Sequence, residues 1–403
     1  MCFGNEIPIS LESLNLADSK LVLRTRRSIM QTLAILSSQA FSISNFRGPL
    51  IEALASQGVR IFALAPDFDK NTRAQVKALG AIPIDISMQR AGLNPFTDLL
   101  CLVRLFFLLR KLRPDVLLGY FIKPVIFGMT AAWLAHIPHR VALIEGLGFV
   151  FTANASAKRR LLKRIVSGMY KLSLLAASRV VFLNTDDIEE FLAAKLVDSR
   201  KIVNLKGIGV NLSTWYSAPA VIEPFTFLLV ARLLREKGIL EYVDAARLVK
   251  AKYPKVRFIL LGALDVNPSS LTQKDLDSWV SEGLLEWPGH VAVQPWLTQT
   301  SVFVLPSYRE GLPRSTQEAM AMARPVITTD VPGCRETVIE NINGFLVPAR
   351  DSAALAQAMF KFVEQPDLVE PMGQQSRRMA ERYFDGQQKT QDLISILRSA
   401  PLN

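Results

Sequence analysis

Apolar runs of strand length alternate with helix-length segments through the first half of the chain. The runs predict strands at 32–36, 59–65, 116–118 and 141–144, and the pattern between them predicts a helix around 49–57. Short apolar strands separated by helices are typical of βαβ units. We therefore expect a parallel sheet in this half.

The same rhythm restarts after a polar, proline-containing stretch at 207–224. It predicts strands at 225–230, 256–261 and 302–305, and a helix at 238–251. The fold class expected is α/β, with two Rossmann-like doubly wound domains at 30–215 and 225–385 and a C-terminal helix at 386–403. Ligands of open α/β sheets bind outside the carboxyl ends of the strands, so we expect the chemistry in a cleft between the domains.

Two segments resemble targeting or membrane signals. Residues 1–29 are polar and irregular, and we interpret them as a flexible extension, with Met30 as an alternative start; a cleaved signal peptide is a third interpretation. The apolar run 99–112 is shorter than the roughly 18 residues that a bilayer span needs and contains Arg104 and Arg110. It predicts a buried helix.

Composition is that of a globular enzyme. The 403 residues exceed the size of one ordinary core, about 250 to 300 residues. Cys2, Cys101 and Cys334 lie far apart, without the spacing of a zinc site or a disulfide framework. The cysteines therefore favour a reducing, cytoplasmic compartment.

Charge differs sharply between the two halves. Residues 1–215 hold 27 basic and 15 acidic residues, whereas the rest of the chain holds 20 and 21. No motif of a nucleic-acid-binding module accompanies the basic half, so we expect no nucleic-acid partner. An anionic membrane surface is the favoured partner.

Two carboxylates flank a predicted helix start after the strand at 302–305. Gly311 and Pro313 are turn and helix-start signals, which places Glu310 on the loop and Glu318 inside the helix. A helix amino terminus offers free N–H groups to a diphosphate, and nearby carboxylates accept hydrogen bonds from sugar hydroxyls. The alternative is a loop charge and an acid favoured by the helix dipole.

Two cations lie in a similar position in the second domain. Arg232 and Lys237 follow the predicted strand at 225–230 and precede the helix that begins near Gly238. Such cations would stabilise the negative charge that develops on a departing nucleoside diphosphate. The alternative is a solvated, basic helix start.

The segment 303–347 resembles the E-x7-E signature region of the family 4 retaining glycosyltransferases. The match includes Pro325-Val-Ile-Thr-Thr-Asp330, Gly333, Glu336 and Asn343-Gly344. The resemblance implies the GT-B fold and transfer with retention from a nucleotide-sugar donor. It also implies that Glu310 approaches the donor sugar, that Glu318 binds the ribose, and that Gly311 and Leu312 supply backbone N–H groups.

Weaker candidates follow from position and from a narrower resemblance. Gly262 and His290 lie in loops that contact the nucleotide base in the family. Segments around 94–96, 119–128 and 141–148 resemble enzymes that assemble capsule, O-antigen or N-glycan precursors on undecaprenyl diphosphate. This makes Lys123, Glu145 and Arg47 candidates for the acceptor or the reacting face, and it implies a polyprenyl-diphosphate-linked saccharide as acceptor.

The first domain departs from the family pattern at two places. Many members carry a Gly-Gly loop after the first strand, where this chain has Ser37-Ser38-Gln39-Ala40. Ile122 stands where a related enzyme carries a histidine.

A basic amphipathic pattern extends from 158 to 171. Its cations are Lys158, Arg159, Arg160, Lys163 and Arg164. A helix of this kind suits the interface of an anionic membrane, so we expect peripheral attachment at the inner face of the cell membrane. The alternative is an ordinary solvated helix face.

The alternatives to this hypothesis are a metal site, an epimerase and a non-enzymatic scaffold. Asp67-Phe-Asp69 has the form of a DxD metal motif, but we interpret it as a turn and expect no metal and no cofactor. The donor that the family resemblance implies is UDP-linked N-acetylhexosamine. A UDP-sugar 2-epimerase would share the fold, yet the three histidines form no recognisable pair. A non-enzymatic basic scaffold would need no diphosphate site.

Overall fold

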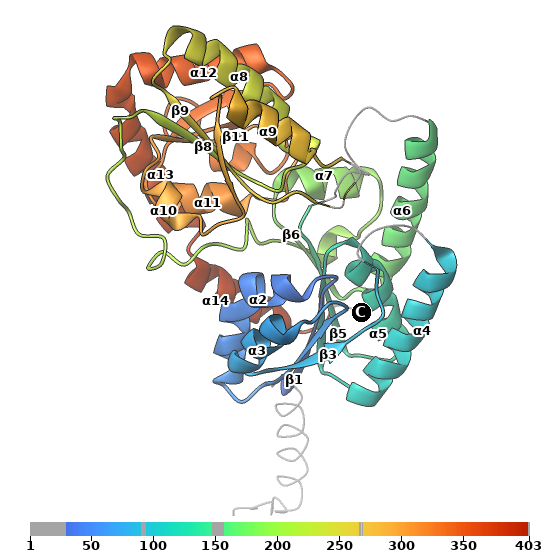
Figure 1. Ribbon diagram of the computed structural model, residues 1–403. Helices are drawn as coiled ribbons and strands as arrows, with labels where there is room; N and C mark the ends of the chain where they lie inside the picture. The colour runs from blue at the N-terminus through green and yellow to red at the C-terminus, as the bar shows by residue number, and fades with distance from the viewer. Residues whose placement is uncertain (1–29, 90–93, 147–156, 266, 268, 402–403) are drawn as a thin grey trace, which may run out of the picture.

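The computed structural model describes residues 30–89, 94–146, 157–265, 267 and 269–401, with side chains described for all of these except 157–163 (Figure 1). The N-terminal extension expected at 1–29 lies outside the described residues. Among those described, no helix combines the length and apolarity needed to cross a bilayer.

The first sheet has seven parallel strands in the order β3-β2-β1-β4-β5-β6-β7. Its inner strands are buried on both faces, which explains their continuous apolar runs, whereas the edge strands β3 and β7 are partly exposed. Helices α2, α3 and α14 cover one face, and η1, α4, α5 and α6 cover the other (Figure 1). The bounds are β1 Thr32–Leu36, α2 Ala40–Ala55, β2 Arg60–Ala65, α3 Lys70–Ala78, β3 Ala81–Asp85, α4 Pro95–Leu112, β4 Val116–Tyr120, η1 Pro124–Gly128, α5 Met129–Leu134, β5 His139–Ile144, α6 Ala157–Ala176, β6 Arg179–Phe182, α7 Thr185–Ala193, η3 Ser199–Lys201 and β7 Ile202–Asn204.

The second sheet has six parallel strands in the order β10-β9-β8-β11-β12-β13. Helices α8 and α12 pack together on one face, and α11 and α13 pack together on the other. The bounds are β8 Thr226–Val230, η4 Arg235–Lys237, α8 Ile239–Lys252, β9 Arg257–Leu261, α9 Gln273–Ser281, β10 Glu286–Gly289, α10 Gln294–Leu297, β11 Val302–Leu305, α11 Arg314–Ala321, β12 Val326–Thr329, η5 Arg335–Thr337, β13 Gly344–Val347, α12 Ser352–Glu364, η6 Pro366–Leu368 and α13 Val369–Tyr383.

The last helix, α14 Gly386–Arg398, returns to the first domain and packs against α2. The ring nitrogen Nε2 of His139 lies 3.1 Å from the carbonyl oxygen of Ile396, and Lys389 donates to the carbonyl of Leu205 at 2.8 Å. The chain therefore ties its two domains together a second time near its end.

The two-domain α/β fold is as expected, but two local predictions were wrong. The helix expected around 49–57 begins earlier, at Ala40, because Asp67 accepts the N–H of Ala40 at 2.6 Å and so caps a turn well before Pro49. The run 99–112 is helical but not buried: only one face of α4 packs inward, through Cys101, Leu105 and Leu109. Sequence apolarity alone did not reveal that its other face is exposed.

Candidate active site

The loop after β11 holds the first glutamate of the predicted motif. Glu310 accepts hydrogen bonds at one carboxylate oxygen from Lys237 Nζ at 2.5 Å and from Ser307 Oγ at 2.7 Å. Its own N–H donates to the carbonyl of Pro332. The structure thus brings together Glu310 and Lys237, which lie far apart in the sequence.

The segment that carries Lys237 packs against the loop that carries Glu310. The N–H of Tyr308 donates to the carbonyl of Glu236 at 2.9 Å. Gly238 has φ 71°, and a side chain there would collide with the carbonyl of Pro306. Glycine is therefore required at 238, and the close approach it permits sets the position of Lys237.

Arg232, the second predicted cation, has a different environment. Its guanidinium lies 3.1 Å from Asp265, and its side chain is 54% exposed. The side chain of Lys237 is 15% exposed. Both cations come from the segment after β8, but Lys237 is the one paired with Glu310.

Glu318 lies inside α11, where it is buried and paired with Arg314 at 3.0 Å. Burial raises its pKa to about 7, although Arg314 acts in the opposite direction. The carboxyl group therefore changes charge near neutral pH, whereas an ordinary glutamate would be fully ionised.

The remaining donor-side candidates differ in what they expose. Leu312 is buried in the core, which leaves its backbone as the part available to a ligand. Gly262 follows β9, and its N–H donates to the carbonyl of Gly289 at 2.9 Å. His290 comes next in that loop, and its side chain is exposed.

The Glu310 loop also touches the first domain. Gly311 packs so closely on the end of β5 that a side chain would collide with the carbonyl of Glu145. The side chain of Glu145 forms a buried ion pair with Arg47, whose guanidinium lies 4.5 Å from the Tyr120 ring centroid. Carboxyl-end loops of both sheets therefore meet at this point, as the fold class predicts.

Lys123 lies elsewhere in the first domain. It donates to Asp98 of α4 at 2.7 Å, and both side chains are nearly buried. In this structure Lys123 joins the segment after β4 to the first turn of α4.

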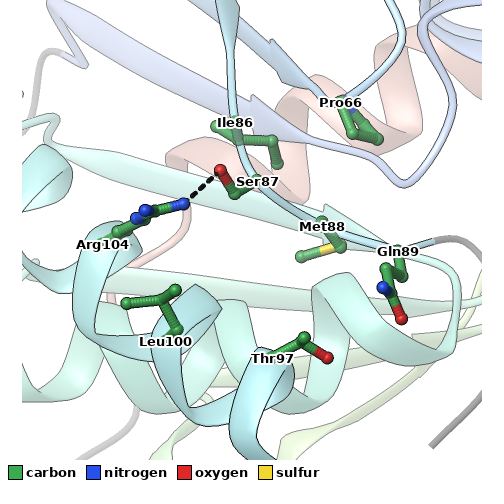
Figure 2. Close-up of a pocket in the computed structure, with 8 residues that line it drawn as sticks. All are labelled: Pro66, Ile86, Ser87, Met88, Gln89, Thr97, Leu100 and Arg104. Carbon is green, nitrogen blue, oxygen red and sulfur yellow. Dashed lines mark hydrogen bonds between the residues drawn. The ribbon is translucent and has the colours of Figure 1, made fainter. Parts of the chain in front are cut away.

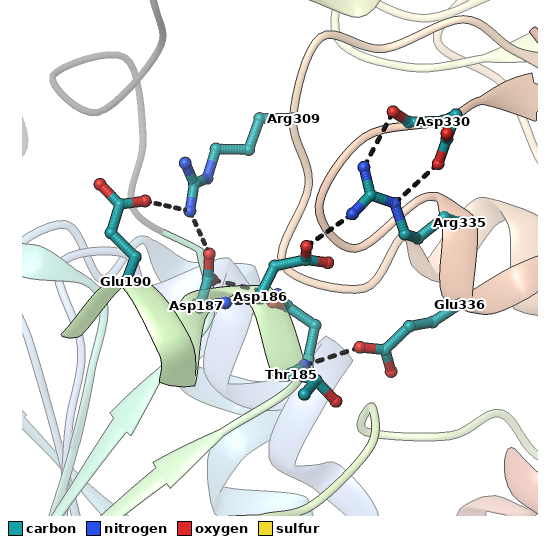
Figure 3. A network of polar contacts seen from close by, with 9 residues as sticks. Thr185, Asp186, Asp187, Glu190, Arg309, Asp330, Arg335 and Glu336 are labelled. Carbon is teal, nitrogen blue, oxygen red and sulfur yellow. Dashed lines mark hydrogen bonds and ion pairs between the residues drawn. The ribbon is translucent and has the colours of Figure 1, made fainter. Parts of the chain in front are cut away.

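A network of charges between the domains was missed by the sequence reasoning (Figure 3). Arg309 pairs with Asp187 and Glu190 of α7, and Arg335 bridges Asp186 and Asp330. The residues Asn184-Thr-Asp-Asp after an apolar strand signal a helix cap, but nothing in the sequence names their partners in the second domain.

Two further contacts join the same elements. Asn184 caps α7 with its Oδ1 and donates from Nδ2 to the carbonyl of Gly311 at 2.5 Å. The N–H of Thr185 donates to Glu336 at 2.7 Å. Burial raises the pKa of Asp187 even with Arg309 beside it.

The predicted metal-like motif has structural partners. Asp67 accepts the N–H of Ala40, and Asp69 caps α3 through the N–H and hydroxyl of Thr72. Both carboxylates thus hold helix starts, as a turn interpretation expects.

The predicted membrane helix is α6. The side chains of Lys158, Arg159, Arg160 and Lys163 lie outside the described part of the structure, while Arg164 is exposed.

A separate pocket of about 300 Å³ lies between α4 and the segment after β3 (Figure 2). It is lined by Pro66, Ile86, Ser87, Met88, Gln89, Thr97, Leu100 and Arg104, none of which belongs to the predicted site.

Comparison with known proteins agrees with the motifs. A model of the glycosyl transferases group 1 matches residues 224–365, and a glycosyl transferase 4-like domain matches residues 44–205. The N,N'-diacetylbacillosaminyl-diphospho-undecaprenol alpha-1,3-N-acetylgalactosaminyltransferase of Campylobacter jejuni is 30% identical over 353 residues, which span 83% of this chain and 90% of that protein. The chain belongs to the family 4 glycosyltransferases.

Other relatives of this glycosyltransferase point the same way. The UDP-Gal:alpha-D-GlcNAc-diphosphoundecaprenol alpha-1,3-galactosyltransferase of Escherichia coli is 26% identical over 286 residues, 67% of this chain and 72% of that protein. The epimerase alternative is not supported, because the family and these relatives are transferases.

Solved structures share the GT-B fold of this glycosyltransferase. HepE of Anabaena in complex with UDP and glucose has a TM-score of 0.72 at 16% identity, covering 92% of this chain and 100% of that one. Sucrose-phosphate synthase of Thermosynechococcus elongatus has a TM-score of 0.75 at 20% identity, covering 91% and 98%.

Proposed function

We propose that this glycosyltransferase moves an N-acetylhexosamine from UDP to a polyprenyl-diphosphate-linked saccharide, with retention of the anomeric configuration. The observation that carries the proposal is the Lys237–Glu310 pair beside the start of α11, where the loop after β11 meets the end of β5. Relatives in Campylobacter jejuni and Escherichia coli, whose acceptors are named as diphospho-undecaprenol-linked, support the choice of acceptor.

The charges of the second domain suit a nucleoside diphosphate. Lys237 and Arg232 supply positive charge, and the first turn of α11 supplies free N–H groups and the positive end of a helix dipole. As the bond to the sugar breaks, negative charge grows on the departing diphosphate, and these preorganised groups stabilise it. No metal ion is needed in this scheme.

Carboxylates then orient the donor. Glu310 accepts hydrogen bonds from hydroxyls of the transferred sugar, and Glu318 accepts them from the ribose. Lys237 and Ser307 both donate to Glu310, and these contacts orient its carboxylate for the donor.

Retention follows if the acceptor attacks from the face that the diphosphate leaves. The acceptor oxygen forms a bond to the anomeric carbon while the bond to the phosphate oxygen breaks. That phosphate oxygen takes the proton of the acceptor hydroxyl, so no second protein carboxylate is required as a base. Arg47 and Glu145 stand on the first-domain side of the junction, where the acceptor would approach.

The acceptor's lipid places the enzyme at the inner face of the cell membrane. Support comes from the excess of basic residues in the first half of the chain and from the basic pattern of α6. Attraction to anionic lipids contributes about 1 kcal/mol per lysine or arginine near the surface.

A donor screen tests the proposal. The full chain is incubated with UDP-N-acetylglucosamine, UDP-N-acetylgalactosamine, UDP-glucose and UDP-galactose, each with and without a polyprenyl-diphosphate-linked saccharide. We expect UDP release and an α-linked product only with acceptor and an N-acetylhexosamine donor. A β-linked product would contradict retention, and sugar conversion without acceptor would contradict transfer.

A further inference from the structure

Helix α4 turns an apolar surface outward. The exposed fractions are 86% for Phe96, 59% for Leu99, 46% for Leu100, 42% for Val103 and 65% for Phe107. These positions recur at the three- and four-residue spacing that places side chains on one face of a helix. Large apolar patches on a protein surface mark interaction sites.

The opposite face of α4 fixes the helix firmly in the domain. Cys101, Leu105 and Leu109 are buried against the core, and Asp98 in the first turn pairs with Lys123. The helix also starts at a side-chain cap, Asn94. The outward apolar residues are therefore held in place by a packed helix.

Cations extend the same outward face. Arg104, Arg110 and Lys111 are exposed on it, while Asp98, the one acidic residue in the sequence of α4, is buried. Arg104 also donates to Ser87 Oγ at 2.7 Å, which holds its guanidinium at the pocket beside α4 (Figure 2). The face is thus apolar from Phe96 to Phe107, with Arg104 beside it and Arg110 and Lys111 beyond its end.

Helix α6 repeats this combination beside α4. Ile165, Leu172 and Leu175 are exposed along one stripe, and Arg164 and Lys171 are exposed next to it. Both helices pack on η1 and α5 and stand along the same side of the first domain (Figure 1). Two neighbouring helices therefore offer apolar and cationic side chains to the same surroundings.

We propose that the outward face of α4 inserts its apolar side chains into the interfacial region of an anionic bilayer, with α6 beside it. Apolar side chains flanked by lysine and arginine are the pattern of helices that lie in a membrane interface. A second copy of the chain suits this face less well, because it would bring the same cations together. The inference rests on the proposed lipid-linked acceptor, and it adds an apolar anchor to the electrostatic attachment through α6.

Vesicle binding by the full chain tests this anchor. The variant Phe96→Ser, Leu99→Ser, Phe107→Ser is compared with Leu248→Ser, Val280→Ser, Ile339→Ser, which changes three exposed apolar residues of the second domain. We expect the α4 variant to lose about tenfold or more in sedimentation with phosphatidylglycerol-containing vesicles, because the transfer free energy of its apolar side chains is lost. The second-domain control should bind as wild type does.

Salt separates the two helices. High salt screens the cations, so binding that persists there should depend on α4. Changing Lys158, Arg159, Arg160, Lys163 and Arg164 to Gln should reduce binding at low salt only. An environment-sensitive fluorophore attached to the cysteine of Leu99→Cys should shift its emission to the blue with vesicles, whereas one attached to that of Leu248→Cys should not.

Two outcomes would overturn the proposal. One is vesicle binding by the α4 variant equal to that of wild type. The other is a concentration-dependent dimer that the α4 variant loses, which would make the face a contact between copies. Transfer to a water-soluble acceptor analogue should be unchanged in the α4 variant, and its absence in wild type would refute the proposed function while leaving the vesicle result standing.

Discussion

Two lysine–carboxylate pairs, one in each domain, are alike in distance and burial but differ in location. Lys123 lies 2.7 Å from Asp98, with 9% and 11% of the side chains exposed. Lys237 lies 2.5 Å from Glu310, with 15% and 14% exposed. The first pair joins a segment after β4 to an outer helix, and the second stands at a strand end beside a helix start. Position at the junction where the Glu310 loop meets the first domain, rather than burial, distinguishes the pair that we assign to chemistry.

The largest effect that we expect is on stability, from breaking the first-domain pair. Lys123→Met should lower the free energy of unfolding by about 3 kcal/mol, because Asp98 is left buried without its partner. Denaturant unfolding measures this. The double variant Lys123→Met, Asp98→Leu should recover most of the loss. If Lys123→Met is as stable as wild type but has a raised KM for the acceptor, Lys123 binds the acceptor instead.

Breaking the second-domain pair should affect turnover rather than folding. Lys237→Ala should lower kcat by about 10²-fold or more, roughly 2.7 kcal/mol, the scale of one preorganised electrostatic contact. We expect a smaller loss for Arg232→Ala, because its side chain is half exposed in this structure. Steady-state kinetics with circular dichroism as the folding control checks both. Wild-type turnover in a folded double variant would refute the diphosphate assignment.

The sequence predicts features that lie within one segment of the chain better than contacts between distant segments. The donor-side residues Glu310 and Glu318 lie close together in one motif that runs from the loop after β11 into α11. Such features are legible because sequence neighbours make them. The strands could also be predicted from the sequence, because strands buried on both faces are apolar throughout.

Contacts between distant segments could not be predicted from the sequence. Arg47 with Glu145, Lys123 with Asp98, and Asn184 with the carbonyl of Gly311 each join elements that only the fold brings together. The exposed face of α4 could not be predicted either, because the apolarity of a helix does not tell whether one face or all faces are buried. Tertiary packing decides which side chains remain exposed.

The second glutamate of the motif, Glu318, predicts that donor binding depends on pH. Burial raises the pKa of Glu318 to about 7, so its carboxylate is lost as the pH falls through that value. A neutral carboxyl accepts ribose hydroxyls more weakly, and we expect the donor KM to rise about tenfold from pH 8 to pH 6. Glu318→Gln should show a high KM with little pH dependence. An unchanged pH profile in that variant would separate Glu318 from donor binding.

Stability should show the opposite pH dependence at this residue. The folded state holds the proton more tightly than the unfolded chain does, so the stabilisation is full below the ordinary glutamate pKa and is lost as pH rises through about 7. Relative to Glu318→Gln, wild type should therefore lose stability between pH 5 and pH 8.

The smallest effect expected is that of metal removal. Lys237, Arg232 and the first turn of α11 already provide positive charge for a diphosphate, so EDTA should leave turnover within about twofold of the untreated enzyme. Assays with the full chain, lipid-linked acceptor and UDP-sugar donor, with and without chelator, measure this. Full loss on chelation with recovery in Mn²⁺ or Mg²⁺ would contradict the scheme. Asp67→Asn and Asp69→Asn would then be tested as ligands, and because both carboxylates hold helix starts, unfolding would be followed alongside activity.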